Sequence, residues 1–308
     1  MVKHESRPGP RVAIVTGAGI GLGRAYARRL AADGLRVIVN NRRREVDAAG
    51  RGSADHVVDE ILAAGGEAVA NYEDVCAEGA GARMVDQALS TWGRLDALVN
   101  NAGVDQHAAF HKIDLDSFRR IFDVNFFGTL GVTHAAWRHM REAGHGRVLV
   151  STSSAGLHGL HGLSAYAASK AALIGLARSL AQEGASRDLY CNAIAPYAAT
   201  RMTAAHTRDA DALATMSPDH IAPLVSMLVS EHSKVNGQVL VAGRGWARRS
   251  ATVELDPLVY VGPEASLDAS AQRFDGRLHI EGICREFRDA LESYEDFQAR
   301  VVGDLRQP

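Results

Sequence analysis

The sequence has few cysteines, no long hydrophobic run and almost no net charge. Cys76, Cys191 and Cys284 lie far apart, outside any Cys-x-x-Cys or Cys/His spacing, so we expect reduced thiols and neither a disulfide framework nor a metal site. No apolar run reaches the ~18 residues that span a bilayer. A net charge of −2 over 308 residues argues against a dedicated nucleic-acid binder, which carries a basic face.

The two ends of the chain lack familiar targeting signals. The first residues, M-V-K-H-E-S-R-P-G-P, carry charges without a following hydrophobic region, unlike a secretory signal. The last residues, R-Q-P, differ from the peroxisomal tripeptide S-K-L. We therefore expect a cytoplasmic protein without membrane attachment.

Short apolar runs alternate with amphipathic stretches from residue 11 to about 245. The expected strands are 11–16, 35–40, 67–72, 96–101, 147–152, 189–196 and 237–242. The expected helices are 21–34, 53–66, 80–92, 116–141 and 164–184. Continuous apolar strands that alternate with helices form a parallel sheet covered on both faces. The sequence therefore predicts an α/β fold, a doubly wound parallel sheet (Rossmann fold), over residues 11–245.

The pattern changes after residue 245. Residues 246–257 show little periodicity, whereas residues 280–302 repeat apolar side chains at helical intervals. We therefore predict a C-terminal helical extension over residues 246–308, packed on its own subunit or on a partner.

A glycine-rich turn, T-G-A-G-I-G-L-G, joins the first strand to the first helix. Gly17 permits the tight turn, Gly21 lets the backbone approach a pyrophosphate, and Gly23 packs the helix on the sheet. The helix N-terminus then attracts the phosphate groups. An ordinary glycine-rich turn is the alternative, but this position in the fold favours a dinucleotide site. Ile20 and Leu22 complete this part of the predicted site.

Two more strand ends carry candidate cofactor contacts. Asp74 and Val75 follow the third strand, where the carboxylate can accept a hydrogen bond from an adenine amino group and the valine can pack on the ring. A solvated turn is the alternative for Asp74. The motif N-N-A-G ends the fourth strand, and its small residues leave room for a flat ligand. The candidates in this motif are Asn101, Ala102 and Gly103.

The second strand ends in V-I-V-N-N-R-R-R. Enzymes that prefer NAD usually place an acidic residue about there, on the ribose hydroxyls. Asn41 removes a charge that would repel a 2′-phosphate, and Arg42 and Arg43 can pair with that phosphate. A solvated loop, with Asn41 alone meeting NAD, is the alternative, and Ile20 supplies no second basic group. We therefore expect NADP or NAD as cofactor, with NADP slightly favoured.

Tyr166 and Lys170 are spaced to share one face of a helix. A nearby ammonium group favours the phenolate and lowers the pKa of a tyrosine, although the same spacing often marks a plain surface pair. Ser153, at the end of the fifth strand, and Asn125, in the long helix after the fourth, point to the same cleft. An asparagine satisfied locally within its helix is the alternative for Asn125.

Taken in order, these motifs resemble the short-chain dehydrogenase/reductase family over residues 11–245. The resemblance implies hydride transfer between nicotinamide and a carbinol carbon, with Tyr166 as general acid/base. Lys170 would lower the pKa of Tyr166 and hold the nicotinamide ribose, so both residues also count as cofactor contacts. Ser153 would orient the substrate oxygen, and Asn125 would hold a water that links Lys170 to solvent.

The segments G-R-A-Y-A, N-A-I-A-P and R-M-T are similar to a subgroup of that family that carries a C-terminal extension. The subgroup acts on 3-hydroxyacyl-CoA and some steroid alcohols, which implies a small-molecule alcohol or ketone as substrate. Around the sixth strand we add Pro196, Thr200 and Met202 as cofactor candidates. Tyr197 departs from the family, in which Gly commonly follows the proline.

Several alternatives stay open at this point. A general carbonyl reductase without a thioester role, or a non-catalytic dinucleotide-binding regulator, would share most of these motifs. His158 and His161 either line the substrate pocket or face water. The short segment 201–217 favours an open cleft and a bulky substrate. The family implies a homodimer or homotetramer.

Overall fold

The computed structural model describes residues 9–42, 46–199, 215–255, 284–288 and 290–304. The chain divides into two compact units, Met1–Arg249 and Ser250–Pro308. The first unit therefore runs past residue 245, the end that we predicted for the dinucleotide-binding domain, because one more strand joins its sheet.

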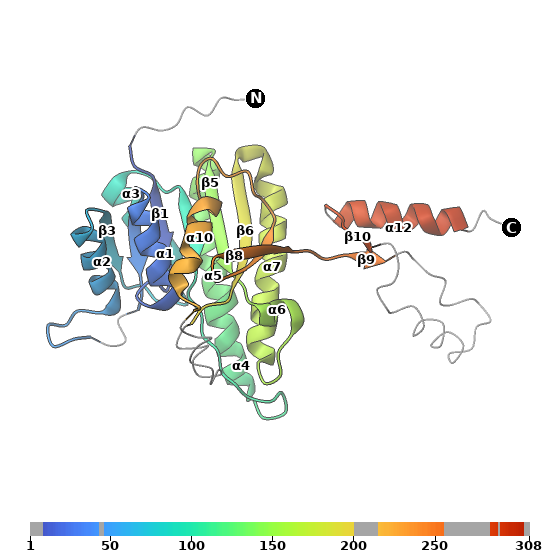
Figure 1. The fold of residues 1–308 in the computed structure, drawn as a ribbon, viewed down its shortest axis with the longest axis horizontal. Helices are drawn as coiled ribbons and strands as arrows, with labels where there is room; N and C mark the ends of the chain where they lie inside the picture. The colour runs from blue at the N-terminus through green and yellow to red at the C-terminus, as the bar shows by residue number, and fades with distance from the viewer. Residues whose placement is uncertain (1–8, 43–45, 200–214, 256–283, 289, 305–308) are drawn as a thin grey trace. The chain divides into compact units, whose positions relative to one another are not determined.

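The first unit is built on an eight-stranded sheet of order β3-β2-β1-β4-β5-β6-β7-β8 (Figure 1). Its strands are β1 (Val12–Val15), β2 (Arg36–Asn40), β3 (Glu67–Asn71), β4 (Ala97–Asn100), β5 (Gly146–Ser151), β6 (Leu189–Pro196), β7 (Val239–Gly243) and β8 (Trp246–Ser250). Neighbouring strands from β3 to β7 pair in parallel. The strand order reverses between β1 and β4, so their carboxyl ends flank the point where such sheets bind ligands. The predicted doubly wound fold is confirmed.

Helices cover both faces of this sheet. One core cluster joins the sheet to α1 (Gly21–Ala32), α2 (Ser53–Ala63) and α10 (Ala222–Leu228). The other joins it to α3 (Ala80–Trp92), α5 (Thr129–Ala143) and α7 (Ser164–Gly184). Along β1, Ala13 and Val15 face the first cluster while Val12 and Ile14 face the second. Burial on both faces explains why consecutive positions in the middle of these strands are apolar.

The segment predicted as one long helix, 116–141, is helical throughout but not uniform. It consists of α4 (Leu115–Phe122), a π-helix η1 (Asp123–Gly128) and α5. A π-helix turn holds an extra residue and is frequent at functional sites, and this one contains Asn125. Gly128 has no side chain here because a Cβ would lie 2.7 Å from Cγ2 of Val75.

The hydrophobic pattern did not indicate β8. Trp246, Ala247, Arg248 and Arg249 are all exposed, so the strand shows no apolar alternation. Arg244 and Gly245 precede it with φ of 52° and 78°, a left-handed pair of the kind that joins strands in tight hairpins.

The second unit pairs two short strands, β9 (Glu254–Leu255) and β10 (Cys284–Arg285), in antiparallel fashion. Its helix α12 (Ala290–Asp304) begins later than the predicted residue 280, because the chain at Cys284 pairs with β9. The Ser293 hydroxyl donates to Glu254 at 2.7 Å. In the part of the chain that the structure describes, no helix is long and apolar enough to cross a membrane.

Candidate active site

The glycine turn brings the end of β1 against the end of β4. Gly17 has a φ of 63°, and a Cβ at this position would lie 2.8 Å from Cα of Ala102. A Cβ on Gly23 would lie 2.2 Å from the carbonyl oxygen of Gly17. Helix α1 begins at Gly21 without a side-chain cap, so its first N–H groups suit an anion. The turn therefore has the close packing and the exposed helix end that a pyrophosphate requires.

Thr16 fixes the two strand ends to each other, a role that we did not predict. Its hydroxyl accepts from the N–H of Asn101 at 3.0 Å and from the N–H of Ala102 at 3.1 Å. The Asn101 side chain donates in return to the carbonyl oxygen of Gly17 at 3.1 Å. The signal available in the sequence was a hydroxyl residue placed directly before the first glycine.

The predicted adenosine contacts lie together at the carboxyl ends of β2 and β3. Register places Asn40 beside Asn71, which brings the segments after both strands side by side. Asn41 donates to the Ser53 hydroxyl at 2.7 Å. Arg42 pairs with Asp74 at 2.9 Å, so the two residues predicted to bind a phosphate and an adenine are partners of each other. Arg43 lies outside the described residues.

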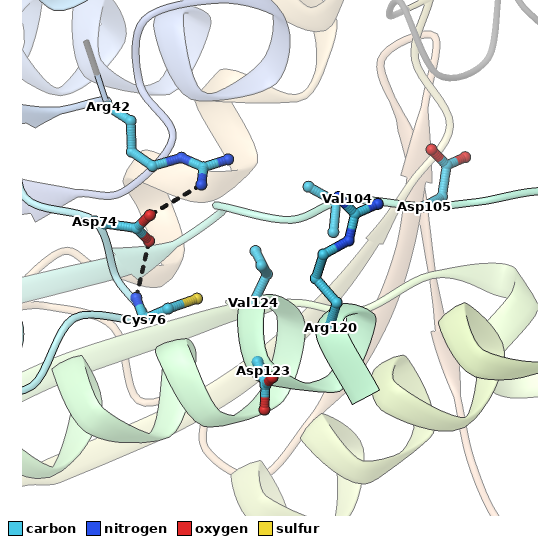
Figure 2. Close-up of a pocket in the computed structure, with 8 residues that line it drawn as sticks. All are labelled: Arg42, Asp74, Cys76, Val104, Asp105, Arg120, Asp123 and Val124. Carbon is cyan, nitrogen blue, oxygen red and sulfur yellow. Dashed lines mark hydrogen bonds and ion pairs between the residues drawn. The ribbon is translucent and has the colours of Figure 1, made fainter. Parts of the chain in front are cut away.

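A cavity of about 390 Å³ opens beside this ion pair. Figure 2 shows Arg42, Asp74 and Cys76 on one side of it and Arg120 with Asp105 on the other. The lining also includes Val104, Asp123 and Val124. Val75 is not among the lining residues and instead contacts the backbone at Gly128. The cavity is large enough for an adenine ring.

Tyr166 and Lys170 lie on the face of α7 that meets the end of β5. The Lys170 ammonium is 5.7 Å from the centroid of the Tyr166 ring and donates to the carbonyl oxygen of Ser151 at 2.7 Å. Thr152 donates to the carbonyl oxygen of Lys170 at 2.7 Å. These bonds fix the lysine and its helix turn against β5.

Burial shifts the pKa values of both residues. It raises the pKa of Tyr166, while the hydrogen bond with Ser153 lowers it and the charge of Asp105 raises it. Burial lowers the pKa of Lys170 from 10.5 to about 8. In this structure burial thus governs Tyr166, and the predicted lowering of its pKa by Lys170 stays a prediction.

Ser153 and Asn125 complete the group that we predicted to be catalytic. Ser153 is the N-cap of α6 (Ser154–His158), and its hydroxyl accepts from the N–H of Ala155 at 3.2 Å while hydrogen-bonding Tyr166. Asn125 is fully buried in η1. A Cβ on Gly103 would lie 3.2 Å from Oδ1 of Asn125 and 3.3 Å from Nζ of Lys170. The structure therefore brings all four residues to one place.

Other predicted site residues have different outcomes. Pro196 ends β6 next to Tyr197, which is 41% exposed. Thr200 and Met202 lie outside the described residues. His158 and His161 are exposed, and Gly162 beside them lies against the ring of His107. Within the described ranges no three His, Cys, Asp or Glu side chains are grouped to hold a metal ion.

Comparison with known proteins identifies the family. The model of the family described as short chain dehydrogenase matches residues 11–211. The chain belongs to this family. It is therefore an oxidoreductase that uses NAD or NADP, and the close-packed glycine turn at the start of α1 fits that cofactor.

Individual relatives narrow the resemblance. A short-chain type dehydrogenase/reductase of Mycobacterium tuberculosis is 40% identical, over 85% of this chain and 92% of its own. The mouse peroxisomal multifunctional enzyme type 2 is 42% identical over 77% of this chain, which corresponds to only 32% of that enzyme. The full-length Drosophila melanogaster enzyme of the same name has a TM-score of 0.81 at 30% identity, covering 98% of this chain and 51% of that one. These matches confirm the predicted resemblance to a subgroup within the family, which peroxisomal multifunctional enzyme type 2 represents.

Proposed function

We propose that the protein interconverts a secondary alcohol and a ketone with NAD or NADP, using Tyr166 as general acid/base. The observation that carries this proposal is the convergence of Tyr166, Ser153 and Lys170 at the end of β5. A general acid must lie within hydrogen-bond reach of the reacting oxygen, and a ketone oxygen can take the place between the two hydroxyls.

Each residue then has one task. In reduction, the Tyr166 hydroxyl gives its proton to the substrate oxygen, and in oxidation the phenolate takes it back. Ser153 donates a hydrogen bond to the same oxygen and holds it beside Tyr166. The cofactor, when bound, supplies or accepts the hydride. Lys170, fixed by Ser151, provides a positive charge that favours the phenolate.

Replacing Tyr166 by Phe tests this mechanism. Tyr166→Phe should lower turnover by ~10³-fold or more, because it removes the proton donor, while cofactor affinity measured by fluorescence titration stays within a few-fold. A variant that still turns over ketones near the wild-type rate would exclude Tyr166 as the acid/base. A non-catalytic regulator, the alternative from another class, would show no turnover in the wild type either.

A 3-hydroxyacyl thioester or a steroid-type alcohol is the substrate class that we propose. The support is the likeness to peroxisomal multifunctional enzyme type 2, of which this chain spans only a part. Assays with acetoacetyl-CoA, a 17-ketosteroid and a simple cyclic ketone, each with NADH and NADPH, separate the candidates. A clear preference for the cyclic ketone would favour a general carbonyl reductase.

We keep NADP as the slightly favoured cofactor, because the position before Arg42 is an uncharged asparagine. To bind the 2′-phosphate of NADP, Arg42 would have to break its ion pair with Asp74. We further propose a cytoplasmic homodimer or homotetramer, as the family implies. A single monomer peak on a sizing column at micromolar concentration would contradict the oligomer.

A further inference from the structure

We propose that Ser169 is a positioning residue for the reaction: its hydroxyl holds the Asn125 carboxamide against the turn of α7 that carries Tyr166 and Lys170. This inference rests on the proposed function, because it concerns turnover at Tyr166. Ser169 was not among the residues that the sequence motifs singled out.

The Asn125 carboxamide has a partner for each of its polar groups. Its Oδ1 accepts from the N–H of Val104 at 2.8 Å, and its Nδ2 donates to the carbonyl oxygen of Val104 at 2.9 Å. The second N–H of Nδ2 donates to Oγ of Ser169 at 3.0 Å. A carboxamide offers two N–H donors and one oxygen, so Ser169 completes the set. A rotated amide would place an N–H against the N–H of Val104, and the network therefore fixes one orientation.

Ser169 carries this chain of hydrogen bonds into α7. Its side chain is fully buried, and its hydroxyl donates to the carbonyl oxygen of Tyr166 at 2.8 Å. A hydroxyl has one hydrogen, and its use on Tyr166 turns the lone pairs of Ser169 toward Asn125. The chain thus runs from η1 to the backbone of the proposed acid/base.

The other side of Asn125 faces the lysine. A Cβ atom added to Gly103 would lie 3.2 Å from Oδ1 of Asn125 and 3.3 Å from Nζ of Lys170. The two side chains therefore approach each other over this glycine. Asn125 therefore lies between the backbone segment that follows β4 and the residues that we propose act on the substrate. Loss of its third hydrogen bond would leave a buried N–H unsatisfied and free the carboxamide to move.

Helix stability does not explain a serine at this position. Serine forms helices less well than alanine, and a hydroxyl bonded to the carbonyl one turn back tends to bend the helix. Alanine would suit a fully buried position of α7 better. The hydroxyl has a reason to be there only through what it contacts, and its partner outside α7 is Asn125.

A double-mutant cycle tests the coupling. Turnover of the best ketone of the substrate panel is measured for wild type, Ser169→Ala, Asn125→Ala and the double variant. Ser169→Ala should lower kcat by ~10-fold, while the KM for the ketone and the KM for the cofactor each change by less than ~3-fold. In the Asn125→Ala background it should lower kcat by less than ~2-fold, because residues that act as one unit are not additive. If Asn125→Ala does not fold, Asn125→Ser takes its place.

Two further variants separate positioning from structure. Ser169→Thr keeps the hydroxyl and should keep most of the wild-type kcat. Thr133→Val is the matched control, because it removes a buried hydroxyl that accepts from the side chain of Asn100 at 2.9 Å, outside the proposed catalytic group. It should lower the melting temperature without lowering kcat.

Four results would overturn the proposal. Ser169→Ala with wild-type kcat, or a full ~10-fold loss that persists without Asn125, excludes the coupling while the proposed function stands. An equal loss of kcat in Thr133→Val makes the effect a general one of buried hydroxyls. A wild type that turns over no ketone ends the proposed function and the positioning role together.

Discussion

The two ends of the sheet in the first unit each bury a cation, but in different company. At the amino end, the Arg147 guanidinium is fully buried and pairs with Asp188 at 3.1 Å, and it also donates to the carbonyl oxygen of Glu231 at 3.2 Å. At the carboxyl end, Lys170 is 4% exposed and its ammonium group donates to the carbonyl oxygen of Ser151. No carboxylate within the described residues forms an ion pair with Lys170.

The difference shows in the pKa values. Burial acting on Lys170 lowers its pKa to about 8. The pKa of Asp188 is lowered although the residue is partly buried. Burial alone would raise this pKa, but the hydrogen bond with His145 and the charge of Arg147 lower it. A buried ion pair of this kind holds structure together, whereas a buried charge without a counter-charge is a sign of function.

Among the variants that test this comparison, Lys170→Met should have the largest effect. Turnover should fall by ~10³-fold, but the free energy of unfolding at pH 7 should stay level or rise. A pKa shift from 10.5 to about 8 corresponds to roughly 3 kcal/mol against the charged form, and methionine removes that cost. Kinetics and urea unfolding measure the two. A less stable variant would show that Lys170 stabilises the fold as Arg147 does.

At the amino end of the sheet, we expect the reverse: a loss of stability without a loss of turnover. Asp188→Asn leaves Arg147 buried without its carboxylate and should lower the free energy of unfolding by ~3 kcal/mol, with kcat unchanged at 25 °C. Arg147→Met is the matched variant and should cost less, since Asp188 keeps His145 at 2.7 Å and Lys234 at 3.7 Å. Equal losses, or a drop in kcat, would contradict this division of roles.

The pH dependence of stability should separate the two ends as well. The pKa of Lys170 is lower in the folded state, so between pH 8 and 10.5 the unfolded chain binds more protons and stability rises with pH. Burial lowers the pKa of His145, so by the same rule stability falls as the pH drops below its ordinary value of 6.5. Urea unfolding across pH 5 to 10 should show the alkaline gain in wild type and not in Lys170→Met.

The smallest expected effect concerns Arg42. Its charge has a carboxylate partner, unlike that of Lys170, but is not buried like that of Arg147. Its ion pair with Asp74 is partly exposed on both sides, and such pairs contribute ~0–1 kcal/mol, so a phosphate can replace the carboxylate. Arg42→Ala should raise the KM for NADP by ~10-fold and leave that for NAD and the stability nearly unchanged. Arg83→Ala, which removes a similar exposed pair with Glu73, is the control. Equal effects on both cofactors would end the case for NADP.

Much of the fold could be predicted because its signals are local. Apolar runs marked β1 to β7, and the glycine turn marked the start of α1. The Tyr166 and Lys170 pair also depends only on helix spacing, which is why it could be placed on one face of α7.

The features that escaped prediction depend on distant parts of the chain. The pairing of Arg42 with Asp74 follows from the register of β2 and β3, which the sequence does not state. Arg147 looks like a surface arginine at the start of a strand, and only the fold surrounds it with Asp188 and Glu231. Ser169 has no pattern of its own, because its partner lies on another helix.

The π-helix η1 has a consequence for how this protein can change over time. The π-helix turn contains one residue more than a regular helix turn. The chain stays helical from α4 to α5, but the face that α4 presents is rotated relative to the face that α5 presents. The extra residue lets α4 pack on α7 while α5 packs on α3. Deleting one residue between Asp123 and Gly128 would restore a regular helix but turn one of these two faces away from its neighbour. We therefore expect this segment to tolerate a substitution at an exposed position better than the deletion of a residue.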